Sequence, residues 1–113
     1  MPVYEIGPSP PFQAQLRWLT RQYPHAADDV HPCLESLRRD PEQGNAIPGW
    51  RRRVWKLRIN SSDIRRGKRY GLRLIYLLEP GLIYPLIVYA KTKKEDVTRA
   101  EILRVLRAIG EEP

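Results

Sequence analysis

The stretch "RRVWKLRINSSDIRRGKRYGLRLIYLL", residues 52–78, carries two apolar segments on either side of a loop that is rich in Arg and Lys. The first segment, "VWKLRI" (54–59), alternates its side chains as a strand with two different faces does. Lys56 and Arg58 leave one face of this strand, and Trp55 leaves the other together with its apolar neighbours. The sequence therefore predicts a sheet that carries positive charge directly beside its core.

Two further segments extend this sheet. "YGLRLIYLL" (70–78) is apolar on both sides at its far end, which is typical of a central strand. "EPG" (79–81) favours a type II turn, and "LIYPLIVYAK" (82–91) is expected to form the next strand. Because Pro85 lacks a backbone donor, it indicates a sheet edge or a bulge in that strand. The three segments together predict an antiparallel meander.

Helical patterns lie before this meander. "VYEI" (3–6) is a candidate short first strand, and "PFQAQLRWLTRQYP" (11–24) then has apolar residues at helical spacing up to its final proline. "HAADDVHPCLESLRRDP" (25–41) continues the helical spacing, with Pro32 expected in the first turn of its main part. The apolar positions of the two predicted helices are Phe12, Leu16, Leu19, Val30, Leu34 and Leu37.

The rest of the chain predicts a loop and a last helix. Residues 42–50 read as a loop, and "TRAEILRVLRAIG" (98–110) places Thr98 three residues before Glu101, which is the spacing of a capping box. We therefore expect an α+β fold in the order β-α-α-β-β-β-α, with two N-terminal helices and a C-terminal helix on one face of a small antiparallel twisted sheet. The 113 residues suit a single domain, 1–113.

Composition narrows the class of partner. Twenty Lys and Arg against 13 Asp and Glu give a net charge of +7, which favours a polyanionic partner: nucleic acid, an acidic protein segment or an anionic membrane surface. With Cys33 as its single cysteine, the chain has no intrachain disulfide and suits a reducing cytosol. No signal peptide is visible at the start, and the longest apolar run is too short to span a bilayer. A cytoplasmic protein without a membrane partner is the resulting expectation.

Half of the 20 basic residues fall in one part of the sequence, where Asp63 is the only acid. These basic residues are Arg51, Arg52, Arg53, Lys56, Arg58, Arg65, Arg66, Lys68, Arg69 and Arg73. Such a concentrated patch attracts phosphate backbones, although a solvated hairpin loop would have the same composition.

The predicted hairpin brings some of these cations together. Lys56, Arg58 and Arg73 are expected to converge on one face of neighbouring strands, and Lys91 ends the third strand near the same rim. A pocket with several cations and no carboxylate is suited to phosphate, since Arg offers planar forked donors and Lys a compact charge. No Cys/His cluster accompanies the patch, so no metal site and no small-molecule cofactor are predicted.

Such a pocket suits RNA cleavage, because RNA carries its own nucleophile in the 2′-hydroxyl group. The reaction needs in-line geometry, stabilisation of charge on the phosphorane, and proton transfer. Arg58 and Arg73 are candidates for the stabilising groups. Neighbouring cations lower the pKa of a lysine, so Lys56 is a candidate general base or acid.

The motifs along residues 53–104 resemble those of the RelE/ParE superfamily of type II toxin–antitoxin toxins. They are an R/K-rich strand, a Gly-Lys loop, a G-x-R-hydrophobic-hydrophobic-Tyr strand and a Y-x-K-x-x-x-E-D run before the last helix. In this sequence the corresponding residues are Lys56, Arg58, Gly67, Lys68, Gly71, Arg73, Tyr76, Tyr89, Lys91, Glu95 and Asp96. The sequence departs from the pattern at Thr92, where the best-known ribosome-dependent members have a second Arg, and in its C-terminal "RAIGEEP", which lacks the Tyr or His of several branches.

The resemblance implies a metal-independent mRNA endoribonuclease that inhibits translation by cutting mRNA on the ribosome. It also implies a cognate acidic antitoxin protein that wraps the toxin and covers the basic site. By this resemblance the catalytic residues are Lys56, Arg58, Arg73 and Lys91. The residues expected to contact the RNA chain are Arg53, Arg65, Arg66, Lys68, Arg69 and Tyr70.

Two other functions fit the same residues. A gyrase-blocking toxin, the role known in the ParE branch, would need no phosphate-cleaving pocket. A catalytically silent basic module would bind nucleic acid or protein without forming a product. Single aromatic and acidic residues are less informative. Trp50 and Trp55 are candidates for stacking on bases, but packing in the core or in a loop is the favoured expectation. Glu95 and Asp96 are candidate catalytic carboxylates, but they also suit a helix N-terminus, which is the favoured expectation.

Overall fold

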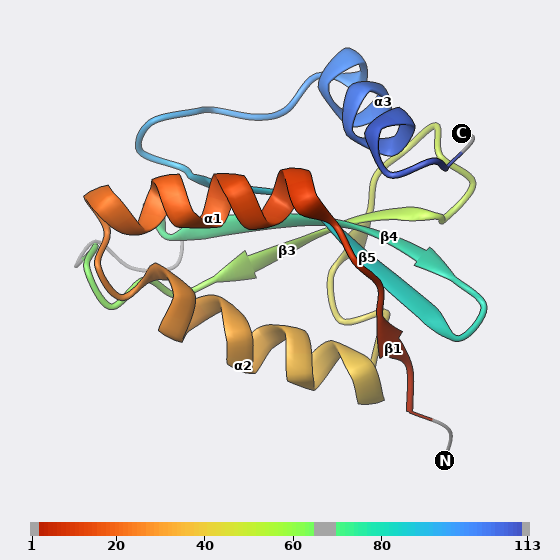
Figure 1. The fold of residues 1–113 in the computed structure, drawn as a ribbon, viewed down its shortest axis with the longest axis horizontal. Helices are drawn as coiled ribbons and strands as arrows, with labels where there is room; N and C mark the ends of the chain where they lie inside the picture. Colours follow the sequence, from red (N-terminus) through yellow and green to blue (C-terminus); the bar gives the residue numbers. More distant parts are fainter. Residues whose placement is uncertain (1–2, 65–69, 112–113) are drawn as a thin grey trace.

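The computed structural model describes residues 3–64 and 70–111 and has the expected α+β class (Figure 1). Its elements in chain order are β1 (Glu5–Ile6), α1 (Pro10–Gln22), α2 (Ala26–Arg39), β2 (Asn45–Ala46), β3 (Val54–Ile59), β4 (Leu72–Glu79), β5 (Leu82–Ala90) and α3 (Arg99–Ala108). Within the described residues no helix has both the length and the apolar composition to cross a membrane.

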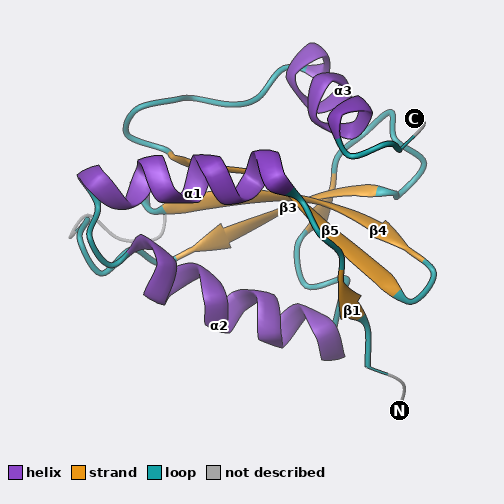
Figure 2. Cartoon of the chain, viewed as in Figure 1, coloured by secondary structure: helices purple, strands orange, loops and turns teal. Residues whose placement is uncertain are grey.

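The strands form one sheet in the order β1-β5-β4-β3-β2 (Figure 2). The predicted meander of β3, β4 and β5 is confirmed, and all of its pairings are antiparallel. The sheet is nevertheless mixed, because β1 pairs in parallel with the start of β5. The two-residue strand β2 lies in the segment that we expected to be a loop, and it extends the sheet on the far side of β3.

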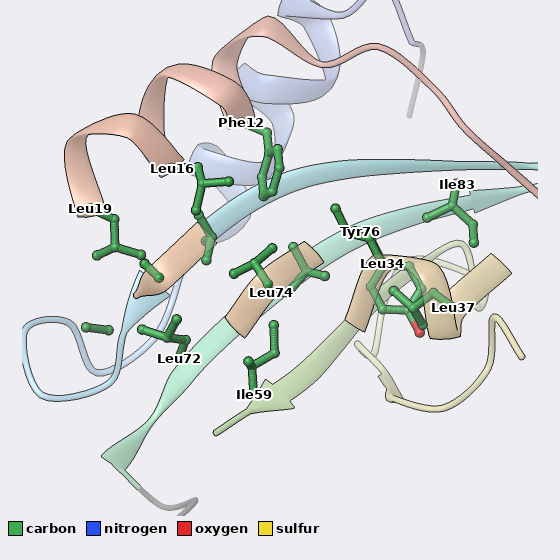
Figure 3. Close-up of a cluster of buried hydrophobic side chains, with 14 of the residues drawn as sticks. Phe12, Leu16, Leu19, Leu34, Leu37, Ile59, Leu72, Leu74, Tyr76 and Ile83 are labelled. Carbon is green, nitrogen blue, oxygen red and sulfur yellow. The ribbon is translucent and has the colours of Figure 1, made fainter. Parts of the chain in front are cut away.

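The helices cover both faces of the sheet, so the expectation that they share one face is wrong. Helices α1 and α2 pack on one face, where Phe12, Leu16 and Leu19 form a buried cluster with Leu72 and Leu74 of β4 (Figure 3). Helix α3 packs on the opposite face, against the alternate residues of β4 such as Ile75. Strand β4 is apolar on both sides, and each side requires a cover that excludes water.

Helix α2 runs through its proline. It begins at Ala26 and contains Pro32 in its interior, so the prediction that Pro32 stands in the first turn is wrong. The apolar positions predicted for α1 and α2 are all buried, and this burial against the sheet stabilises both helices. The capping box of Thr98 and Glu101 is confirmed at the start of α3.

Strand β5 contains the expected irregularity at Pro85. Its pairing with β4 shifts between Ile75 and Tyr76, which is the bulge that this proline indicated. The two residues of β1 pair only with the first part of β5, ending at Ile83. Beyond that point a side chain of α1 partners the edge of β5: the side-chain oxygen of Gln15 accepts a hydrogen bond of 3.0 Å from the backbone N–H of Val88. Both features place Pro85 where no ladder donor is missed.

The loop after β3 is tied to the start of α2. The carboxylate of Asp63 accepts hydrogen bonds of 2.8 Å from the ring Nδ1 of His25 and 2.9 Å from its backbone N–H. One residue earlier, Ser62 donates from both its N–H and its hydroxyl to Asp29 of α2. These contacts hold residues 60–64 against the helix and thereby position the exit of β3.

The contact between His25 and Asp63 predicts a pH-dependent stability. The hydrogen bond that His25 donates to Asp63 raises the pKa of His25, to which the charges of Asp63, Asp28 and Asp29 also contribute, and the same hydrogen bond lowers the pKa of Asp63. The contribution of protonated His25 to the stability of the fold is thus complete below its unfolded pKa of 6.5, and it is lost as pH rises through the raised pKa of the folded state. The contribution of ionised Asp63 to the stability of the fold is present above its unfolded pKa of 3.8, and it is lost as pH falls through the lowered pKa of the folded state.

We therefore expect His25→Asn to reduce the free energy of unfolding more at about pH 5 than at about pH 8. Urea unfolding at the two pH values measures the difference. His31→Asn is the control, because His31 is exposed and its ring makes no hydrogen bond within the described residues. An effect of His25→Asn that is equal at both pH values would contradict the prediction.

Candidate functional site

The meander places three of the predicted catalytic residues on one face of the sheet. Arg58 of β3 stands directly opposite Arg73 of β4, and Arg73 stands opposite Tyr89 of β5. Arg58, Arg73 and Tyr89 therefore form a row across the strands. Lys56 lies two residues before Arg58 on the same side of β3. Helix α3 covers the same face of the sheet over Ile75 and Leu77 of β4, and Arg73 precedes these residues on β4.

All four predicted catalytic residues line one pocket of about 660 Å³. Lys56 and Arg58 come from β3, Arg73 comes from β4, and Lys91 follows the end of β5. The backbone N–H of Lys91 donates to the carbonyl oxygen of Gly71 at 3.0 Å, which holds the end of β5 beside the start of β4. The predicted convergence of these cations is therefore present in the fold.

Arg73 is the most enclosed of these cations, with 4% of its surface exposed. Burial lowers the pKa of Arg73, and the positive charge of Arg58 lowers it further. Its Nη1 donates to the carbonyl oxygen of Leu72 at 3.1 Å, which helps to fix the orientation of the guanidinium group. An arginine that is held in this way presents its charge with little further ordering when an anion binds.

The pocket also contains carboxylates, so the prediction of a pocket without them is wrong. Nζ of Lys56 lies 2.8 Å from Oδ1 of Asp96. Nζ of Lys91 donates to the backbone oxygen of Glu95 and lies 3.4 Å from its Oε1. Both acids belong to the segment between β5 and α3, which the sequence separates widely from the basic stretch. An incoming phosphate would share Lys56 and Lys91 with these carboxylates.

Asp96 links three groups of the pocket. The hydrogen bond from Lys56 lowers the pKa of Asp96, so the carboxylate is ionised at neutral pH. Its Oδ1 also accepts from the backbone N–H of Val97 at 2.8 Å, which agrees with the expectation of an acid near the N-terminus of the last helix. The hydroxyl of Tyr89 lies 3.5 Å from the same oxygen, and burial together with Asp96 raises the pKa of Tyr89 to about 12. Tyr89 is therefore a neutral donor at physiological pH.

Neither of the two described residues that were predicted to contact RNA lines the pocket. Arg53 lies outside the pocket at the start of β3, where it forms an ion pair with Glu79. Tyr70 is half-buried and does not line the pocket. The other four, Arg65, Arg66, Lys68 and Arg69, lie outside the described residues.

The sequence patterns did not single out Arg99, and they did not place Trp50 at the pocket wall. Arg99, the first residue of α3, places its guanidinium carbon 4.1 Å from the ring centroid of Trp50 and donates to the carbonyl oxygen of Gly49 at 3.3 Å. Trp50 has 7% of its surface exposed, so it packs in the core as expected and supports this cation from below. No spacing in the sequence pairs these residues, because they meet only when α3 covers the sheet.

Neither the protein-family models nor the curated proteins include a match to this chain. Across residues 3–64 and 70–111, no group of three or more His, Cys, Asp or Glu side chains is arranged to hold a metal ion. The charged side chains that line the pocket are those of Lys56, Arg58, Arg73, Lys91, Arg99, Glu95 and Asp96, and its volume is within the range of small-molecule sites.

Proposed function

We propose that the protein is an endoribonuclease that binds the scissile phosphate of mRNA in this pocket. The observation that carries the proposal is the meeting of four cations from β3, β4 and the end of β5 around a single hollow, with Arg73 buried at its wall. Arginine recognises phosphate oxygens through paired planar donors, and a water-poor setting strengthens that interaction.

In the proposed reaction the 2′-hydroxyl oxygen attacks the adjacent phosphorus and the bond to the 5′-oxygen breaks. The 2′-hydroxyl gives up its proton to solvent water, the leaving 5′-oxygen gains one from Lys56, and the products are a 2′,3′-cyclic phosphate and a 5′-hydroxyl end. Arg58 and Arg73 lie side by side and would stabilise the extra negative charge of the phosphorane.

Lys56 is the candidate proton donor to the leaving oxygen. Its ammonium group donates to Asp96, which holds it at the pocket wall. The lowered pKa of Asp96 makes this carboxylate a weak base, so its proposed part is to position Lys56 rather than to take the proton of the 2′-hydroxyl.

We further propose that the protein is the toxin of a type II toxin–antitoxin pair and works in the cytoplasm on ribosome-bound mRNA. The motif resemblance to RelE/ParE toxins supports this assignment. The net charge of +7 supports an acidic antitoxin that covers the cationic pocket.

Inducible expression followed by mapping of mRNA ends tests the proposal. We expect wild-type protein to arrest growth and to create new 5′-hydroxyl ends within coding regions. Arg73→Ala and Lys56→Gln should abolish both effects, and Lys56→Gln is included because Arg73 is buried and its loss can weaken the fold. Lys93→Gln is the matched control, since Lys93 is exposed and does not line the pocket.

The other outcomes separate the alternative functions. Growth arrest that persists in Lys56→Gln without new mRNA ends would favour gyrase inhibition. RNA binding without product, in the presence of ribosomes, would favour a catalytically silent module. Either result would overturn the proposed cleavage.

A further inference from the structure

A strained turn lies beside the pocket. Residues 50–53 form a tight turn in which the N–H of Arg53 donates to the carbonyl oxygen of Trp50 at 3.0 Å. Its two central residues, Arg51 and Arg52, have φ values of +53° and +60°. Turns with positive φ at both central positions normally carry Asn, Asp or Gly, because a longer side chain makes the left-handed conformation unfavourable.

Arg52 has contacts that account for its presence in this turn. Its Nη2 lies 2.8 Å from Oε1 of Glu42, and its guanidinium carbon lies 4.8 Å from the ring centroid of Trp55. Arg51 is different, since its exposed side chain makes no hydrogen bond and no ion pair with the described residues. The fold thus keeps an unfavourable backbone at Arg51 although its side chain forms no hydrogen bond or ion pair with residues 3–64 and 70–111, and such strain is concentrated at functional sites.

The turn forms a second hollow of about 440 Å³ that is lined by Gly49, Trp50, Arg51, Arg53 and Arg99. Three of these five residues are arginines and none is an acid, although Arg53 also pairs with Glu79 outside the lining. Trp50 and Arg99 line the first pocket as well, so the two hollows share a wall. A chain that leaves the first pocket along this wall therefore meets the second.

We propose that this second hollow is a phosphate subsite for a flanking nucleotide of the same RNA strand. The inference rests on the proposed function and specifies how the pocket holds a longer substrate. Arg51 and Arg99 would donate to the phosphate oxygens, as planar guanidinium groups do. Trp50 has only 7% of its surface exposed and Arg99 lies over its ring, so the ring offers little surface on which a base could stack. The subsite therefore recognises the backbone, independently of sequence.

Arg51→Gly tests this inference with opposite effects on stability and binding. Glycine adopts positive φ without strain, so the melting temperature should equal or exceed that of the wild type. Affinity for an RNA of about 12 nucleotides should fall about tenfold at low salt, and the slope of log Kd against log salt should decrease by about 0.7. Affinity for a dinucleotide, which fills only the first pocket, should be unchanged.

The probes are 2′-O-methyl RNAs, which lack the attacking hydroxyl and are not cleaved, and binding is followed by fluorescence anisotropy. Arg17→Ala is the matched control, because it removes one exposed arginine from α1 and should leave the affinity for either RNA unchanged. Equal affinities of Arg51→Gly and wild type for the longer RNA, with wild-type cleavage intact, would overturn the subsite alone. Absence of binding and cleavage by the wild type would overturn the proposed function as well. Loss of binding to a poly-glutamate peptide but not to RNA would assign the hollow to a protein partner and also overturn the subsite.

Discussion

Replacing Arg58 with Ala should lower the rate of RNA cleavage by about 100-fold or more, while the protein remains at least as stable as the wild type. Arg58 is exposed at the pocket and stands directly opposite the buried Arg73. Loss of one donor to a developing negative charge has an effect of this size in other enzymes. Like charges directly opposite each other on neighbouring strands destabilise a sheet. Removing the charge of Arg58 is therefore expected to add a few tenths of a kcal/mol to the free energy of unfolding.

The combination of these two effects distinguishes a catalytic role from a structural one. Single-turnover cleavage of ribosome-bound mRNA measures the rate, and urea unfolding measures stability. Arg107→Ala is the control for the loss of one positive charge, because Arg107 is exposed on α3 and does not line the pocket. Cleavage at the wild-type rate by Arg58→Ala would show that the row of arginines does not act on the phosphate.

Gly71→Ala is expected to reduce the free energy of unfolding by about 3 kcal/mol, the largest stability effect that we predict. A Cβ atom at Gly71 would overlap with the carbonyl oxygen of Ile59 on β3. That oxygen belongs to the backbone and has no rotamer with which to move away, so β3 and β4 must separate at this end. The carbonyl oxygen of Gly71 also accepts from Lys91, so the same shift would displace two walls of the pocket.

Gly81→Ala provides the comparison. Gly81 has a φ of +74°, but a Cβ atom there would meet no other atom within 4 Å. Its replacement should therefore cost only the conformational penalty of about 1 kcal/mol, and it should leave cleavage unchanged. Urea unfolding of both variants measures the difference. Similar losses for the two variants would mean that the backbones at Gly71 adapt more easily than the close approach indicates.

Local patterns explain why the strands and helices could be predicted. The alternation of Lys56 and Arg58 with apolar neighbours requires a strand, and the helical spacing of Phe12, Leu16 and Leu19 requires a helix, because each pattern buries one face only in that conformation. The patterns do not state which face of the sheet a helix covers. The apolar stripe of α3 would suit either face of the sheet, and α3 packs on the face that α1 and α2 leave uncovered.

The candidate site divides in the same way. A period of two puts Lys56 and Arg58 on one side of a strand, and antiparallel pairing of the two predicted neighbouring strands puts Arg73 beside them, so the sequence by itself determined the cationic side of the pocket. Only the tertiary structure brought in Asp96, Glu95, Arg99 and Trp50, since these residues reach the cations through the return of β5 and the docking of α3. Neighbours along a strand follow from backbone geometry alone, whereas contacts between distant segments depend on how whole surfaces fit together.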